Sequence, residues 1–300
     1  MESTKKITRA MELIAASQMV RAQGRIAGSR PYLAGIERVL ADVASDGTAP
    51  EHLIGLPESP ERVAVVAIVS DRGLCGGYNA FVLRTADRLI RTGEQAGRSY
   101  VISVAGKKAV GYFRFRRRQV DHTFSMSDRP TYEHARRIAA TVVPAFMSGR
   151  LDLVQLVSTR FVSAATQTVE VRQLLPLEPR GGEDAAPPLE REGFFEYEPA
   201  AQDLLALLVP RYAEAAVFEA LLEASASEHV ARQRAMAAAT DNADELIKNL
   251  RRVMNRARQD SITTEIMEIV GGAEALRQGE ADESAPAEQD DYIVFEEQTT

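Results

Sequence analysis

The fold is decided by the stretch ARQRAMAAATDNADELIKNLRRVMNRARQDSITTEIMEIVGGAEAL, Ala231 to Leu276, which reads as one unbroken helix. From Ala201 to Leu276 the only proline is Pro210. A helix of about 70 residues, at 1.5 Å per residue, is about 100 Å long, whereas an average helix has about 12 residues. Its apolar residues follow the seven-residue repeat of a coiled coil. They form two neighbouring rows: Leu246, Leu250, Val253 and Ala257, then Ile247, Met254, Ile262, Ile266, Ile269 and Ala273.

A helix with such a stripe needs a second long helix to cover it, and the N-terminal segment is the candidate within this chain. Residues from Ser3 to about Ser45 predict a helix, in which Pro31 should cause a kink or an interruption. Its apolar residues are three and four apart: Ile7, Met11, Ile14, then Met19, Ala22, Ile26. We therefore expect residues 1–48 and 201–276 to form an antiparallel coiled coil.

The middle of the chain, residues 61–200, alternates between strand and helix patterns. Strands are predicted at residues 62–70, 100–105, 151–159 and 169–175, with an edge strand at 194–197. Helices are predicted at residues 80–91, 107–115 and 131–147. This alternation predicts a Rossmann-like α/β domain. The expected fold class is α/β, with a long antiparallel coiled coil of the terminal helices added to that domain.

Three segments are expected to lack regular structure. Residues 49–60, with three prolines, predict a linker, and residues 180–192 predict a loop. The tail, residues 277–300, has eight acidic residues and one basic residue, which account for the net charge of −7. We expect this tail to be disordered.

The composition argues against several kinds of site. The chain has one cysteine, Cys75, which excludes an intrachain disulfide and a multi-cysteine zinc site. Its four histidines show no metal-ligand spacing. We therefore expect no metal site. The N-terminus is polar, so we expect no signal peptide. No run of 18 apolar residues exists, so we expect no direct membrane span.

The segment DRGLCGGYN, Asp71 to Asn79, lies between the first predicted strand and the next helix. Rossmann-like folds hold phosphates at this position, but the spacing matches neither G-x-G-x-x-G nor G-x-x-x-x-G-K-[ST]. We interpret Gly73, Gly76 and Gly77 as the glycines of a tight turn and expect no catalytic residue. A Rossmann-like nucleotide-binding enzyme remains an alternative.

Both predicted terminal helices are basic. In the C-terminal one the basic residues are Lys248, Arg251, Arg252, Arg256 and Arg258. Such a surface can bind nucleic acid or meet acidic protein surfaces. Because no aromatic residues are interleaved with these basic ones, we expect no nucleic-acid partner. A coiled-coil nucleic-acid-binding protein remains the second alternative.

Three segments together resemble the gamma subunit family of F-type ATP synthases: Thr4–Tyr32, Ser70–Asn79 and Ala231–Leu276. The resemblance implies the central rotor stalk, whose terminal helices insert into the alpha/beta hexamer and drive the beta subunits through their conformational cycle for ATP synthesis. It implies that ATP chemistry occurs in those partners, and that this chain has no cofactor. The α/β domain would contact the epsilon subunit and the c-ring, as a peripheral protein on the cytoplasmic side of the cell membrane.

The resemblance also implies which residues face the beta subunits: Met11, Arg258, Gln259, Thr263 and Glu265. Two departures from the family accompany it. Family members normally have a further basic helical turn or two before the pattern at Thr4. We therefore expect either a misassigned start codon or a coiled coil whose helices are incompletely paired at the tip of the shaft. The acidic tail is the second departure.

Overall fold

The computed structural model describes residues 1–45, 53–55, 58–177 and 200–283. The chain divides into two compact units. One unit is residues 2–241, and the other is Met1 with residues 242–300. Among the described residues, no helix has an apolar stretch of the length that a bilayer crossing requires.

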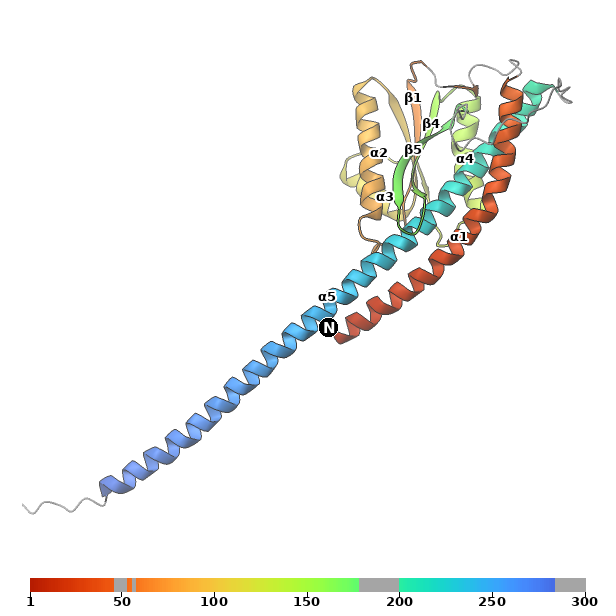
Figure 1. The fold of residues 1–300 in the computed structure, drawn as a ribbon. Coiled ribbons are helices and arrows are strands. Elements are labelled where there is room, and N and C mark those ends of the chain that lie inside the picture. Colours follow the sequence, from red (N-terminus) through yellow and green to blue (C-terminus); the bar gives the residue numbers. More distant parts are fainter. Residues whose placement is uncertain (46–52, 56–57, 178–199, 284–300) are drawn as a thin grey trace, which may run out of the picture. The chain divides into compact units, whose positions relative to one another are not determined.

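A five-stranded sheet lies at the centre of the unit formed by residues 2–241 (Figure 1). Its order is β3-β2-β1-β4-β5, with the bounds β1 Arg62–Ile68, β2 Ser99–Ala105, β3 His122–Phe124, β4 Leu153–Phe161 and β5 Gln167–Leu175. The first four strands are parallel, and β5 pairs antiparallel with β4. In β1 every residue from Val63 to Ile68 is buried, as expected for a parallel strand covered on both faces.

Helices cover both faces of this sheet and create two apolar cores (Figure 1). On one face, α2 (Tyr78–Gln95) and α3 (Lys107–Phe115) bury residues such as Ile90 and Phe113 against β1. On the other face, α4 (Tyr132–Met147) packs with α1 (Glu2–Ser45) and the first part of α5 (Ala201–Glu283). The predicted Rossmann-like layering is confirmed.

The first helix runs antiparallel to the first part of α5 (Figure 1). The hydroxyl oxygens of Thr8 and Thr240 are 2.8 Å apart, and Arg30 lies 3.9 Å from Glu223. The buried residues of α1 recur at coiled-coil spacing: Ala15, Ala22, Ile26, Leu33, Leu40 and Val43. Two of them, Ala22 and Ile26, pack against Leu222, Ala226 and Val230. The predicted antiparallel pairing of the terminal helices is confirmed within residues 2–241, where α1 packs against the first part of α5.

The contact face of the coiled coil differs from the predicted one at its N-terminal end. Ile7 and Ile14 are exposed, and the buried position is Ala15. At this end of the helix the buried positions are the small residues Ala15 and Ala22, and a small side chain lets two helix backbones approach closely. On α5, the predicted rows are also exposed at most positions from Leu246 to Ile269.

Pro31 does not interrupt α1, which is helical on both sides of it. Pro31 and Ala27 are both exposed. The carbonyl that a proline leaves without its helical donor is that of the residue four positions earlier, here on a solvated side of the helix where water can bond to it. The predicted interruption was therefore wrong, whereas the predicted kink stays a prediction.

The other elements agree closely with the predicted ranges, with three differences. The three-residue strand β3 was missed, and Ile54, in the predicted linker, forms an isolated bridge with Leu177. The helix α5 continues to Glu283, so the tail expected from residue 277 begins as helix. The predicted loop at 180–192, the edge strand at 194–197 and the rest of the tail lie outside the described residues.

Candidate functional site

The turn between β1 and α2 is held together by its own side chains. The backbone N–H of Ser70 donates to Asn79 Oδ1 at 2.9 Å, and Asn79 Nδ2 donates to the carbonyl of Arg72 at 3.3 Å. Gly76 has φ of +56°, a conformation that favours glycine. A side chain at Gly77 would lie 2.6 Å from the Phe81 ring. These features explain how glycines allow the chain to turn within a few residues.

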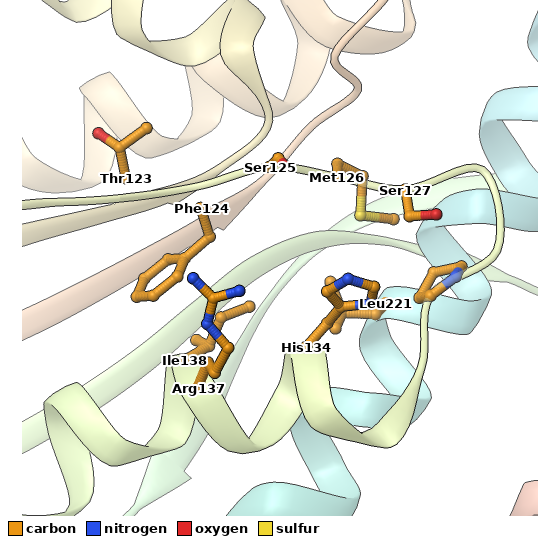
Figure 2. A pocket seen from close by; sticks show the side chains of 10 residues that line it. Thr123, Phe124, Ser125, Met126, Ser127, His134, Arg137, Ile138 and Leu221 are labelled. Atoms are coloured by element: carbon orange, nitrogen blue, oxygen red, sulfur yellow. The ribbon is translucent and has the colours of Figure 1, made fainter.

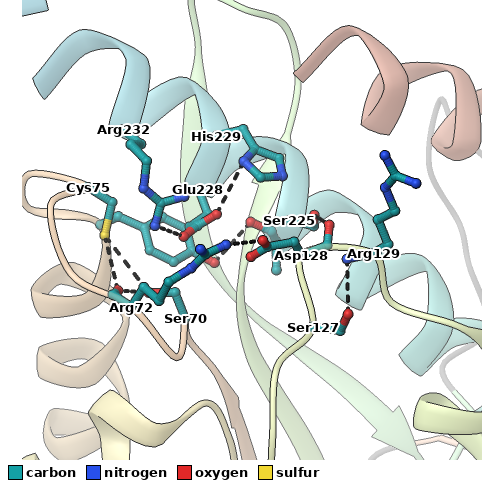
Figure 3. Close-up of polar contacts among 12 residues, drawn as sticks. Ser70, Arg72, Cys75, Ser127, Asp128, Arg129, Ser225, Glu228, His229 and Arg232 are labelled. Carbon is teal, nitrogen blue, oxygen red and sulfur yellow. Dashed lines mark hydrogen bonds and ion pairs between the residues drawn. The ribbon is translucent and has the colours of Figure 1, made fainter. Parts of the chain in front are cut away.

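This turn rests against α5 through a buried cluster of charged side chains (Figure 3). Arg232 pairs with Glu228 one helical turn earlier and also donates to the carbonyl of Gly73 at 3.3 Å. His229 Nδ1 lies 3.5 Å from Glu228, and burial lowers the pKa of this histidine. Tyr78, the first residue of α2, donates its hydroxyl to the carbonyl of Ala224 at 3.1 Å.

A second loop, residues 125–130, closes the same junction (Figure 3). Asp128 pairs with Arg72 of the turn, and its carbonyl accepts the hydroxyl of Ser225 at 3.0 Å. The Asp71 carboxylate accepts backbone N–H groups of Lys107 and Met126 at 2.8 and 3.0 Å. Asp71 and Arg72 therefore connect loops. Cys75 is buried, and burial raises the pKa of its thiol.

The sequence interpretation missed Glu228, His229 and Arg232 as members of this junction. Their signal was a charged pair four residues apart on an alanine-rich helix. That pattern is usual for an exposed helix surface. Only the fold shows that this side of α5 faces the turn.

The space beside the turn is too small for a nucleotide. The cavity between the turn, the 126–128 loop and α5 has a volume of about 10 Å³, whereas ligand sites usually have about 300–1,000 Å³. The geometry therefore favours a mechanical joint between the sheet and α5.

A larger pocket, of about 90 Å³, lies between α4 and the segment after β3 (Figure 2). His134 and Arg137 line one wall, and Phe124 and Leu221 contribute apolar surface. The backbone N–H of Thr131 donates to His134 Nδ1 at 2.9 Å. This pocket is also below the size of a nucleotide site. Among the described residues, no group of histidine, cysteine, aspartate and glutamate could hold a metal ion.

Another group of charged residues lies between β5 and α5. Arg172 donates to the carbonyl of Ala216 at 2.9 Å and to Glu219 at 3.3 Å. Glu223, one turn further along α5, is 5% exposed. Burial, with the nearby charge of Glu219 as a smaller cause, raises the pKa of Glu223 to about 7.

The predicted beta-facing residues lie in both units. Met11 is half-buried on α1, whereas Arg258, Gln259, Thr263 and Glu265 are exposed on α5. At 3.6 residues per turn, Arg258 and Glu265 lie along one edge of the face centred on Ile262 and Ile266, and Gln259 and Thr263 lie along the other. Both isoleucines are exposed. The second unit thus presents an apolar strip between two polar edges.

The buried pair of Glu228 and Arg232 should be costly to break from one side. We expect Arg232→Met to lower the free energy of unfolding by about 3–5 kcal/mol, because it leaves the Glu228 carboxylate buried without its partner. The double variant Glu228→Gln/Arg232→Met should be more stable than Arg232→Met. The matched control is Arg136→Met, which removes an exposed ion pair with Glu133 and should cost less than about 1 kcal/mol.

Urea unfolding of the full chain measures all three variants. Equal losses for Arg232→Met and Arg136→Met would show that the junction is not held by this pair.

Stability should depend on pH through Glu223. Because its pKa is raised in the folded chain, the folded state keeps the proton that the unfolded state loses above its ordinary pKa near 4.5. The free energy of unfolding should therefore fall as pH rises from 4.5 through about 7, by up to about 3 kcal/mol. Glu223→Gln should remove most of this fall.

The measurement is urea unfolding at pH 4.5, 6 and 8, with Glu133→Gln as the exposed control. A Glu223→Gln chain whose stability falls with pH as steeply as that of the unaltered chain contradicts the assignment.

Comparison with known proteins places these features in a family. The sequence pattern described as ATP synthase matches residues 1–276. The ATP synthase gamma chain of Frankia casuarinae is 46% identical over 290 residues, covering 93% of this chain and 95% of that protein. That of Mycolicibacterium vanbaalenii is 45% identical over 289 residues, covering 91% and 94%.

Solved structures share the fold at lower identity. The central stalk and c-ring structure of Tetrahymena thermophila mitochondrial ATP synthase has a chain with a TM-score of 0.59 and 24% identity, covering 78% of this chain and 99% of that one. A chain of the Euglena gracilis mitochondrial ATP synthase has a TM-score of 0.58 and 17% identity, covering 98% and 100%. With a family match over residues 1–276 and relatives of about 45% identity over nearly the whole length, the chain belongs to the ATP synthase gamma chain family.

Proposed function

We propose that this chain is the central rotor stalk of an F-type ATP synthase, and that its rotation couples proton-driven turning of the c-ring to the conformational cycle of the beta subunits. The observation that supports this most strongly is the 83-residue helix α5 in a member of this family. In residues 242–277 it exposes nearly every side chain, including a row of large apolar ones. A long row of exposed, large apolar side chains on a protein in water marks a place where other proteins bind.

The exposed face of α5 has the chemistry that such a contact needs. Its central strip of Ile262, Ile266 and Ile269 can slide or pack against apolar walls. Arg258 and Glu265 on one edge, and Gln259 and Thr263 on the other, offer polar contacts that differ around the helix. A face that is not the same all round can favour one conformation of a neighbouring beta subunit over another as the helix turns.

The coiled-coil segments and the sheet domain have separate roles in this proposal. Residues 1–48 and 201–276 form the shaft, with Met11 as a further contact to beta, and residues 61–200 form the domain that meets the epsilon subunit and the c-ring. Residues 277–300 are the acidic tail. The turn glycines Gly73, Gly76 and Gly77 let the domain sit close to α5.

In this proposal the chain is not itself an enzyme and needs no cofactor, because ATP is made and hydrolysed in the alpha and beta partners. It is attached to the cytoplasmic side of the cell membrane as a peripheral protein through those partners. The two alternatives have less support. A nucleotide-binding enzyme would need more space than the cavity of about 10 Å³ beside the β1–α2 turn. A nucleic-acid binder is supported only by the basic residues of the two helices, and the described part of the fold offers no further support for it.

The test uses the assembled complex with single substitutions on the exposed face of α5. We expect Arg258→Glu to lower the rate of ATP synthesis about tenfold, which corresponds to about 1.4 kcal/mol of activation free energy. The same change should alter the unfolding free energy of the isolated chain by less than about 0.5 kcal/mol, since the Arg258 side chain is exposed and has no ion pair among the described residues.

Two adjacent threonines provide a matched control. Thr263 is on the polar edge, whereas the Thr264 hydroxyl donates to the carbonyl of Asp260 of its own helix at 2.9 Å and lies about 100° further round. Thr263→Ala should lower ATP synthesis more than Thr264→Ala. Equal effects of the two, unaffected synthesis with Arg258→Glu, or a chain that does not co-purify with alpha and beta subunits would refute the proposal.

A further inference from the structure

The end of α3 places an exposed phenylalanine among arginines. The sequence there is FRFRRR, residues 113–118. Phe113 is fully buried and anchors the helix, but Phe115 is 83% exposed. Burying such a side chain is worth about 1.5–3 kcal/mol, so its position in water beside cationic groups suggests an unmet contact. We define the arginine–phenylalanine patch as Arg114, Phe115, Arg116 and Arg117.

The backbone holds the patch in a fixed arrangement. The N–H groups of Arg116, Arg117 and Arg118 donate to carbonyls of the preceding helical turn at 2.9–3.0 Å. Arg117 has φ of +57°, in the left-handed region that ends the helix. The Arg116 guanidinium lies 5.6 Å from the centre of the Tyr112 ring. A surface that is already ordered loses less conformational entropy when it binds.

The positive charge of the patch is not balanced within the described part of the chain. Asp87 and Glu94 of α2 are both paired with Arg118, at 3.0 and 2.6 Å. Asp121 accepts the backbone N–H of Ile102 at 2.7 Å. In the ranges that the structure describes, no carboxylate pairs with the side chains of Arg114, Arg116 or Arg117.

We propose that the arginine–phenylalanine patch docks a partner protein that offers an apolar pocket for the Phe115 ring and a rim of two or more carboxylates. Aromatic residues and arginine are enriched in protein interfaces, and a guanidinium binds a carboxylate through two parallel hydrogen bonds. The inference rests on the rotor proposal and deepens it, because it names the residues of the sheet domain that dock a partner and the chemistry of that partner's surface.

An anionic membrane fits the patch less well than a protein. One phenylalanine adds at most about 3 kcal/mol of apolar burial. Each arginine near an anionic surface adds about 1 kcal/mol. Stable membrane attachment usually combines a basic patch with a lipid chain, which buries far more apolar surface than one ring.

The test replaces Phe115 with the photo-crosslinking residue p-benzoylphenylalanine in the chain expressed together with the other subunits of its complex. Irradiation should give one main adduct, on a partner peptide with at least two aspartates or glutamates close to the linked residue. In the same chain, Arg114→Glu/Arg117→Glu should lower the adduct yield at least about tenfold through like-charge repulsion. The control Arg136→Glu, on α4, should leave the yield unchanged.

Several results would overturn the inference: a lipid adduct, an adduct on a peptide without carboxylates, no adduct, or a yield that Arg114→Glu/Arg117→Glu does not change. If that charge reversal prevents folding, Arg114→Gln/Arg117→Gln replaces it, with an expected decrease of about threefold. ATP synthesis by the same preparations reports separately on the rotor. A complex that synthesises ATP but gives no adduct refutes the docking patch alone.

Discussion

The structure depends on one constraint, which is that α5 has more apolar surface than a small sheet domain can cover. Its first part solves this with two partners, because the sheet and α4 bury Leu205 and Leu221, while α1 buries Leu222 and Ala226 from another side. Beyond Asp241, the large apolar side chains from Leu246 to Ile269 are exposed within the described part of the chain. In the proposed function, the surfaces of neighbouring subunits cover these side chains.

A rotating shaft is useful only if its load reaches the sheet domain without slipping. The junction at the β1–α2 turn meets this need with contacts of several types. Arg232 and Glu228 are buried and paired, Tyr78 bonds to the backbone of α5, and Asp128 joins a second loop to the same helix. Buried polar contacts of this type resist sliding, because a shift along the helix would leave charged groups unpaired in a space without water. A purely apolar seam would slide more easily.

Much of this architecture could be predicted from the sequence, because its signals are local. The β-branched run of β1 and the proline-free length of α5 each determine one element. The side of a helix that meets its neighbour is less predictable, since heptad spacing fits several rows at once. Ile7 and Ile14 were as regular as Ala15, yet the alanine makes the contact. The buried charges of Glu228 and Arg232 look like a surface pair in sequence, and the patch around Phe115 has significance only because the fold leaves that ring exposed.

The rotor proposal requires α1 and the first part of α5, both within residues 2–241, to turn together. Thr8 and Thr240, whose hydroxyl oxygens are 2.8 Å apart, allow the most direct measurement, since cysteines at both positions would be within reach of a disulfide. The native Cys75 is buried. In the assembled complex, oxidised Thr8→Cys/Thr240→Cys should form the bond and retain the ATP-driven rotation rate of the reduced complex. Failure of the bond to form, or rotation that stops on oxidation and resumes on reduction, would contradict a shaft in which the two helices move together.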